Sequence, residues 1–281
     1  MTKPIRIDRV ETIIVDVPTI RPHVLAMATM RVQAMVIVRL YCSDGIIGLG
    51  EGTTIGGLSY GDESPEGIKL AIDTYISPLL QQADASRPAA AMAAIEAAIV
   101  GNHFAKCAVE TALLDAAGKR AGLALSELLG GRVCDRIPVL WTLASGETAT
   151  DIAEAEKMLE LRRHNAFKLK IGKRPLADDI AHVSAIKRAL GDRASVRVDV
   201  NQAWDEPTAT RGLAMLGDAG VDLCEQPVAR SNRPAMARLC ASSPIAVMAD
   251  EALRGPHDAF AFAAEAAANV FAVKIAQSGG P

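Results

Sequence analysis

The chain has few aromatic residues and almost no excess of either charge. Phenylalanine, tryptophan and tyrosine make up 4% of its 281 residues, and the formal net charge is -3. Nucleic-acid-binding surfaces rely on clustered positive charge and on stacking aromatics, and anionic membrane surfaces also attract basic segments. The composition therefore argues against both partners. With 50% hydrophobic and 22% charged residues, it predicts a globular protein with a large core.

The sequence also lacks paired cysteines and long apolar runs. Its five cysteines are widely spaced, without a C-x-x-C pair, which argues against a disulfide framework or a zinc knuckle and favours reduced thiols. The N-terminus alternates charged and apolar residues instead of showing a secretory signal, and no apolar run reaches the roughly 18 residues of a membrane helix. We therefore expect a cytoplasmic protein without membrane contact.

The first half of the chain, residues 1–130, predicts an α+β domain. β-Branched runs within residues 5–15 and 36–38, and a third run at 46–51 after the turn signal Ser43-Asp44-Gly45, predict sequential antiparallel strands. From about residue 65 the apolar spacing becomes helical. Gly48-Leu49-Gly50 lacks the third glycine and the following helix of a dinucleotide-binding turn, so we interpret it as ordinary turn chemistry.

The second half, residues 131–281, alternates short apolar runs with helical stretches. This repeated strand–helix–strand pattern, without a glycine-rich dinucleotide turn, predicts a (β/α) barrel of the TIM type. The chain ends just after the sixth run, so the barrel is expected to be incomplete. The six predicted strands are 139–143, 167–171, 196–200, 221–224, 245–248 and 270–275.

Charged and amide side chains lie near the ends of the last five of these runs. Successive charges at positions 170, 199, 225, 250 and 274 are separated by 29, 26, 25 and 24 residues, one βα unit each. We therefore expect them together at the carboxyl end of the strands, where such barrels carry out their chemistry. The residues are Lys168, Lys170, Asp199, Asn201, Glu225, Gln226, Asp250 and Lys274.

Three of these residues, Asp199, Glu225 and Asp250, predict a metal site. Three adjacent carboxylates would raise one another's pKa unless a cation compensates their charge, and oxygen-only ligands select Mn²⁺ or Mg²⁺ over zinc or copper. Lys168 and Lys170 lie two residues apart, so both point to one face of their strand. A lysine close to another lysine and to a divalent cation is expected to have a lowered pKa, which suits proton transfer near neutral pH.

The order Lys-x-Lys, Asp-x-Asn, Glu-Gln-Pro, Asp-Glu and Lys resembles that of the enolase superfamily, in its muconate lactonizing branch. The resemblance covers the whole chain, and the N-terminal half is similar to the capping domain of that family. Racemases, dehydratases and epimerases share the same ligand set. The stretches 19–23, 53–57, 141–145 and 168–172 narrow the resemblance to muconate and chloromuconate cycloisomerases.

This resemblance implies an isomerase that acts as an intramolecular lyase. It would convert cis,cis-muconate, or a chlorinated muconate, to muconolactone through an enolate, in the β-ketoadipate pathway of catechol catabolism. Lys170 would be the acid that protonates the α-carbon, Lys168 would lower the pKa of Lys170 and hold a carboxylate, and Lys274, opposite them, would stabilise the enolate together with the metal. Asn201 and Gln226 would orient the metal ligands.

The resemblance also implies a set of substrate-binding and lid residues and a homo-oligomeric, octameric state for the full-length protein. The substrate-binding and lid residues are Arg21, His23, Thr53, Thr54, Ile55 and Trp141. Three other histidines, His164, His182 and His257, are expected on helix or loop surfaces.

Two other interpretations stay open. One is another reaction of the superfamily, an acid-sugar dehydration or an epimerisation, whose expected late histidine base would lie beyond Pro281. The other is a fragment without activity, because family members continue for two more βα units that carry a further acidic catalytic residue. Turnover of muconate would separate both from a cycloisomerase.

Overall fold

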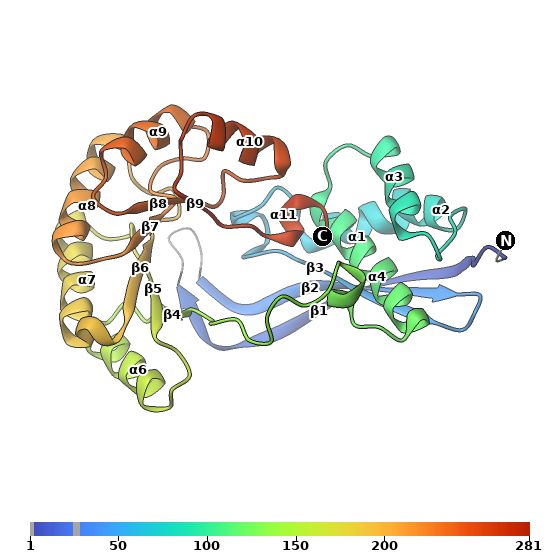
Figure 1. Cartoon of the computed structure of the whole chain (residues 1–281), viewed down its shortest axis with the longest axis horizontal. Coiled ribbons are helices and arrows are strands. Elements are labelled where there is room, and N and C mark those ends of the chain that lie inside the picture. Colours follow the sequence, from blue (N-terminus) through green and yellow to red (C-terminus); the bar gives the residue numbers. More distant parts are fainter. Residues whose placement is uncertain (1–2, 25–28) are drawn as a thin grey trace. The chain divides into compact units, whose positions relative to one another are not determined.

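The computed structural model describes residues 3–24 and 29–281, which form two compact units (Figure 1). The first unit comprises Met1–Pro18, Val32–Asp135 and Lys274–Pro281, and the second comprises Thr19–Arg31 and Arg136–Val273. Three segments, 19–31, 131–135 and 274–281, are therefore assigned differently from the division at residues 130 and 131 that the sequence predicts, and that division remains a prediction. No helix among the described residues combines the length and apolar character needed to cross a bilayer.

The first unit is an α+β structure, as predicted. Its sheet has the order β1-β2-β3, with β2 and β3 antiparallel, and all five cysteines of the chain are free. The strands are β1 (Ile7–Val24), β2 (Thr29–Cys42) and β3 (Ile47–Thr53); residues 19–24 of β1 and 29–31 of β2 belong to the second unit. The helices are η1 (Gly57–Ser59), α1 (Pro65–Ala71), the π-helix η2 (Ile72–Ile76), α2 (Ser77–Leu80), α3 (Pro88–Ala98), α4 (His103–Ala121), α5 (Leu125–Leu128) and α11 (Ile275–Ser278).

Strand β3 packs against helix α4 through alternate glycines. A Cβ atom on Gly50 would lie 1.9 Å from the carbonyl oxygen of Ala108, and one on Gly48 would lie 2.2 Å from that of Ala112. Only glycine permits this approach of helix to strand. The interpretation of Gly48-Leu49-Gly50 as a turn is therefore wrong: these residues lie inside a strand, and their missing side chains make room for the helix.

The second unit is a six-stranded parallel sheet in the order β4-β5-β6-β7-β8-β9, with helices outside it (Figure 1). Its core fills the space between strands and helices. The strands are β4 (Trp141–Leu143), β5 (Ala166–Lys170), β6 (Ser195–Asp199), β7 (Leu223–Glu225), β8 (Ala246–Ala249) and β9 (Val270–Phe271). The helices are α6 (Thr148–Glu160), α7 (Leu176–Leu190), η3 (Gly191–Arg193), α8 (Glu206–Asp218), α9 (Arg233–Ser242) and α10 (Pro256–Ala264).

The sixth predicted strand is shorter than expected. Strand β9 covers only Val270–Phe271, because its partner β8 ends at Ala249 and offers no further ladder position. Lys274, predicted at the end of this strand, instead precedes α11, which contacts α4 in the first unit. The prediction of a strand through residue 275 is wrong.

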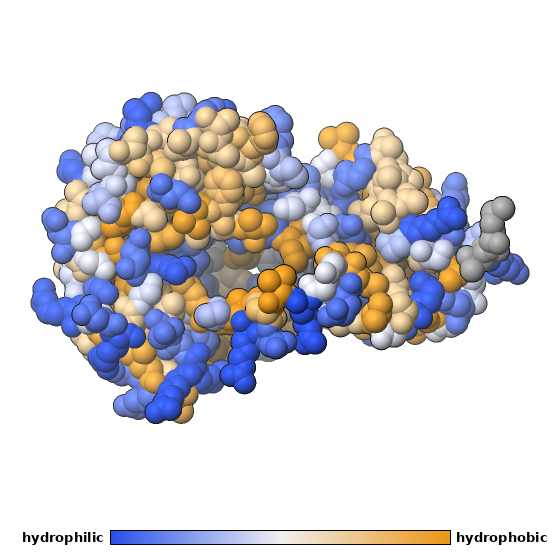
Figure 2. All heavy atoms as spheres, viewed as in Figure 1, coloured by the Kyte–Doolittle hydropathy of each residue, from blue (hydrophilic) through white to orange (hydrophobic). Residues whose placement is uncertain are grey.

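Apolar side chains also reach the surface of the second unit. They gather over α10, where the side chain of Phe260 is 80% exposed (Figure 2). Its neighbour Phe262, two residues on, is 2% exposed and belongs to the core. An exposed phenylalanine beside other apolar side chains is typical of an interaction surface.

The close contact between β3 and α4 predicts the effect of one methyl group. Gly50→Ala should lower the free energy of unfolding by about 1–3 kcal/mol, because the new Cβ overlaps the α4 backbone. Gly67→Ala in α1 is the matched control, since its Cβ would lie 3.5 Å from the Ser64 hydroxyl and alanine favours a helix. Urea denaturation measures both. Equal midpoints for Gly50→Ala and the wild type would contradict the packing described here.

Candidate active site

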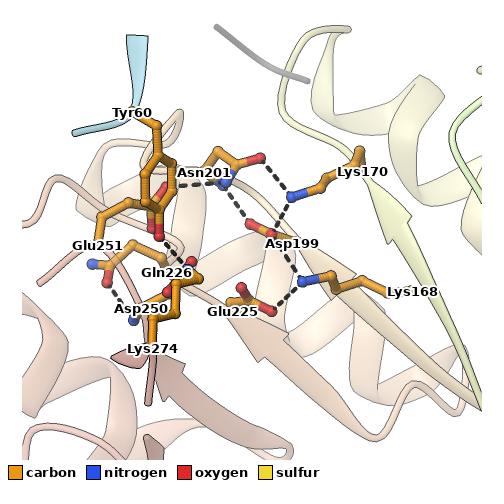
Figure 3. A network of polar contacts seen from close by, with 10 residues as sticks. All are labelled: Tyr60, Lys168, Lys170, Asp199, Asn201, Glu225, Gln226, Asp250, Glu251 and Lys274. Carbon is orange, nitrogen blue, oxygen red and sulfur yellow. Dashed lines mark hydrogen bonds and ion pairs between the residues drawn. The ribbon is translucent and has the colours of Figure 1, made fainter. Parts of the chain in front are cut away.

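The predicted metal ligands converge at the carboxyl ends of three neighbouring strands. Asp199 and Glu225 are the last residues of β6 and β7 and pair directly across the ladder, and Asp250 follows β8. Each carboxylate offers one oxygen, and these oxygens all lie within 4.8 Å of one another. The three residues are 0%, 5% and 2% exposed, so their charges are removed from water (Figure 3). The neighbouring Glu251 is not among the three converging carboxylates.

Burial and mutual repulsion dominate the electrostatics of the carboxylates. Burial, with the negative charge of Asp199, raises the pKa of Glu225 to about 8, and the opposing charge of Lys168 does not offset them. Burial also acts to raise the pKa of Asp199, but the charges of Lys170 and Lys168 outweigh it and hold that pKa below its ordinary value. The negative charge of Glu225 is therefore not fully compensated by positive charge nearby.

The two lysines of β5 bring positive charge to two of these carboxylates. Lys170 Nζ lies 2.5 Å from Asp199 Oδ2, and Lys168 Nζ lies 2.9 Å from Glu225 Oε2 and 3.4 Å from Asp199 Oδ2 (Figure 3). Burial acts to lower the pKa of Lys168, but Asp199 and Glu225 raise it to about 12. The pKa is raised because two carboxylates contact the Lys168 ammonium group; the lowered lysine pKa expected beside a bound divalent cation stays a prediction.

Asn201 and Gln226 connect the ligand-bearing strands. Asn201 accepts a hydrogen bond from Lys170 Nζ at 3.2 Å through Oδ1, and its backbone N–H donates to Asp199 Oδ1 at 3.0 Å. The Oε1 atom of Gln226 accepts from the backbone N–H of Asp250 at 2.9 Å. Asn201 and Gln226 have φ values of 47° and 38°, in the left-handed region that non-glycine residues rarely occupy. The backbone therefore turns sharply next to two of the ligands.

Buried carboxylates on the next helices hold the loops that follow β4 and β5. Asp151 in α6 accepts hydrogen bonds from Ser145 N and Oγ, and Asp179 in α7 accepts from Gly172 N at 2.7 Å and Arg174 Nε at 3.0 Å. Both carboxylates are 1% exposed. The sequence analysis missed them, although an acidic residue in the first turn of a helix after a barrel strand was a usable signal.

One histidine takes part in the same polar network. His182 is only 4% exposed; its Nδ1 lies 2.8 Å from Thr148 Oγ1 and its Nε2 lies 3.4 Å from Asp151 Oδ2. The expectation that His182 lies on the surface is therefore wrong, since Thr148 and Asp151 provide polar partners inside the unit. His257 is exposed, as expected, whereas His164 is half-buried: its ring centre lies 5.0 Å from that of Trp141, and its Nδ1 lies 2.7 Å from the carbonyl oxygen of Val139.

Three of the expected substrate-binding and lid residues, Arg21, His23 and Trp141, belong to the second unit. Burial, assisted by the positive charges of Lys170, Arg21 and Lys168, lowers the pKa of His23. The positive charges of both lysines therefore disfavour protonation of the His23 imidazole. Arg21 and Trp141 both donate to Glu154 in α6, a residue that no sequence pattern indicated.

The other expected lid residues belong to the first unit. Thr53 ends β3, and Thr54 and Ile55 follow it. Thr54 is 1% exposed, and its hydroxyl has no hydrogen-bond partner among the described residues. In the same unit Lys274 Nζ donates to the hydroxyl of Tyr60 and lies 4.6 Å from the centre of its ring. Tyr60 is another residue that sequence patterns did not reveal.

The cluster of Asp199, Glu225 and Asp250 fits a hard divalent cation. Its donors are oxygens only, they are buried, and they lie close enough together to contact one ion. The raised pKa of Glu225 gives independent support, because it shows uncompensated negative charge where a cation would bind. The adjacent lysines add hydrogen-bond donors for an anionic group.

Comparison with known proteins agrees with this geometry. Residues 9–130 match the family profile described as the mandelate racemase / muconate lactonizing enzyme N-terminal domain, and residues 150–281 match the enolase C-terminal domain-like profile. Members of the enolase superfamily use a divalent metal ion, in agreement with the three converging carboxylates.

Individual relatives match over nearly the whole chain. It is 60% identical over 277 residues to muconate cycloisomerase 1-2 of Acinetobacter lwoffii, covering 99% of this chain and 72% of that protein. It is 45% identical over 275 residues to chloromuconate cycloisomerase of Delftia acidovorans, covering 98% and 74%.

A solved structure gives the same result. The muconate lactonizing enzyme of Pseudomonas fluorescens, in complex with muconolactone, is 62% identical and superposes with a TM-score of 0.98, covering 99% of this chain and 75% of that one. Both family profiles, the sequence identities and the fold agree. The chain therefore belongs to the mandelate racemase and muconate lactonizing enzyme family of the enolase superfamily.

Proposed function

We propose that the protein is a cycloisomerase that converts cis,cis-muconate to muconolactone in catechol catabolism. The observation that carries this proposal is the 60% identity to a muconate cycloisomerase over nearly the whole chain. The identity to a chloromuconate cycloisomerase is 45%, which favours the unsubstituted substrate. A cytoplasmic location follows from the pathway. A homo-oligomer, and the octamer in particular, rests on family resemblance alone.

Charge balance supports a dianionic substrate. Without a cation, the three carboxylates outnumber the two lysines of β5 in the second unit. We propose that Asp199, Glu225 and Asp250 hold Mn²⁺ or Mg²⁺, which reverses this balance and leaves the site positive. When bound, the cation supplies charge that favours negative charge developing on a substrate carboxylate.

The reaction proposed for this chain needs one proton. A carboxylate oxygen of muconate forms a C–O bond to the carbon β to the other carboxylate. The π bond between this carbon and the α-carbon breaks, and its electron pair moves toward that carboxylate as an enolate. Lys170 then donates a proton from Nζ to the α-carbon, forming the C–H bond of the lactone. Contacts with Asp199 and Asn201 hold the Lys170 ammonium group in place.

The other predicted site residues receive supporting roles in this proposal. Lys168, held by Glu225 and Asp199, stays charged and binds a substrate carboxylate. Lys274 stabilises the enolate, and Asn201 and Gln226 orient the ligands. The hydroxyl of Thr54 would bind substrate, which would satisfy a buried polar group. Thr53 and Ile55 stay predicted lid residues, and His23 and Trp141 stay predicted substrate-binding residues.

The function is tested by following the ultraviolet absorbance of cis,cis-muconate. The protein should consume it with Mn²⁺ present and stop when a chelator is added. Asp199→Asn, Glu225→Gln and Asp250→Asn should each abolish turnover and weaken Mn²⁺ binding severely, because each removes a ligand charge. Asp205→Asn, a helix cap of α8, is the control. Unchanged metal affinity in all three ligand variants would refute the site, and turnover of acid sugars alone would favour the dehydratase or epimerase alternative.

The raised pKa of Glu225 predicts pH-dependent metal binding. Below about 8 this carboxyl holds a proton that a cation must displace, so Mn²⁺ affinity should rise about tenfold per pH unit from pH 6 and level off above pH 8. Glu225→Gln should bind weakly and without this slope. Calorimetric titration in two buffers of different ionisation enthalpy measures both affinity and released protons. An affinity that is constant between pH 6 and 8 would contradict the prediction.

The role of Lys170 is tested by isotope exchange. In deuterium oxide the wild type should incorporate deuterium at the α-carbon of the lactone, and Lys170→Ala should not, with kcat lowered at least about 10²–10⁴-fold. Lys170→Arg should fail almost as completely, because a guanidinium keeps its proton near neutral pH. Lys157→Ala on α6 controls for loss of a lysine elsewhere. Normal exchange by Lys170→Ala together with none by Lys274→Ala would assign the acid to Lys274 instead.

A further inference from the structure

One carboxylate oxygen in the second unit gathers donors from two separate strands. Oε1 of Glu154 accepts from Arg21 Nη2 at 2.8 Å, from Arg21 Nε at 3.3 Å and from Trp141 Nε1 at 2.9 Å. Arg21 Nη2 also donates to the backbone carbonyl of Thr142 at 2.8 Å. Arg21 lies in β1, Trp141 and Thr142 in β4, and Glu154 in α6. The Arg21 and Glu154 side chains are 27% and 19% exposed, so the ion pair is largely removed from water.

These contacts change the role expected of Arg21. Its Nε and Nη2 atoms face Glu154 and Thr142, and its guanidinium carbon lies 5.8 Å from the centre of the Trp141 ring. A substrate carboxylate would compete for the same donors with a carboxylate that the protein already provides. The geometry therefore favours Arg21 as a structural anchor over Arg21 as a ligand of the substrate.

The anchored segment carries His23. Alternate residues of a strand point to the same side, so Arg21 and His23 share one side of β1. The positive charges of Lys170 and Lys168 act on His23, which places the imidazole in the electrostatic neighbourhood of the metal-site lysines. The contacts that fix Arg21 therefore also fix the position of His23, which lies two residues further along the same strand.

We infer that Glu154 is a positioning residue for substrate binding: it anchors Arg21 and Trp141 and thereby holds the segment of β1 that carries His23. This inference rests on the proposed function for its catalytic consequence but not for its structural one. Arg21 acts through the same anchor and does not contact the substrate. Loss of Glu154 should therefore weaken substrate binding more than it slows the proton transfer by Lys170.

The test compares Glu154→Ala and Glu154→Gln with Glu156→Gln. Glu156 lies on the same helix and forms an ion pair with Arg193 at 2.5 Å, away from β1, which makes it a matched control. Glu154→Ala should raise KM for cis,cis-muconate about tenfold and change kcat less than twofold, because a charge-assisted hydrogen bond is removed from the binding side only. Mn²⁺ affinity should not change. Glu154→Gln should give a smaller rise in KM, since its amide oxygen can still accept.

A fluorescence readout tests the anchor without turnover. The chain has two tryptophans, and Trp204 is 6% exposed in the core, so acrylamide quenching reports mainly on Trp141. Quenching should increase in Glu154→Ala and stay at the wild-type level in Glu156→Gln. Unchanged quenching in Glu154→Ala would overturn the anchor. If the two variants show these quenching results but the wild type does not consume muconate, the proposed function is refuted and the anchor still holds.

A double-mutant cycle separates anchoring from direct binding. If Arg21 and Glu154 act as one unit, the variant carrying both Arg21→Ala and Glu154→Ala should have the same KM as Arg21→Ala alone. A raised KM in Arg21→Ala with a normal KM in Glu154→Ala would overturn the inference, because Arg21 would then contact the substrate itself. Thermal unfolding of each variant verifies that it is folded.

Discussion

The mutual repulsion of three buried carboxylates is the constraint on which the candidate site depends. Asp199, Glu225 and Asp250 are removed from water and face one another, and an arrangement of this kind is stable only with positive charge nearby. Lys168 and Lys170 provide part of it, and the pKa of Glu225, raised to about 8, shows what remains uncompensated. The same imbalance makes the site suited to a divalent cation and, with the cation bound, to a dicarboxylate.

The parallel sheet turns this constraint into a defined geometry. In-register pairing places Lys170 next to Asp199 and Asp199 next to Glu225, so their side chains point to one side of the sheet. Behind the strand ends, Asp151 and Asp179 bind backbone N–H groups of the following loops. The lysines and carboxylates of the candidate site thus lie on strands whose following loops are fixed by hydrogen bonds, an arrangement that restricts how far these side chains can move.

The first unit achieves rigidity by a different means. Its helix α4 approaches β3 so closely that Gly48 and Gly50 have no room for side chains. The loop after β3 carries Thr54 and Tyr60, and Tyr60 contacts Lys274 at the other end of the chain. Close backbone packing of α4 on β3 thus supports the strand from which the predicted lid residues 53–55 extend.

The sequence by itself determined the residues of the metal site and the class of fold. One charge per βα unit repeats at the spacing of parallel strands, so Asp199, Glu225 and Asp250 could be grouped from the sequence, and the alternation of apolar runs with helical stretches predicted the parallel strands. Both are local signals that repeat along the chain. Only the tertiary structure placed Lys274 before a helix of the first unit, buried His182 against Asp151, and brought Glu154 to Arg21, 133 residues away. Such contacts join single residues from distant elements, and no period in the sequence encodes them.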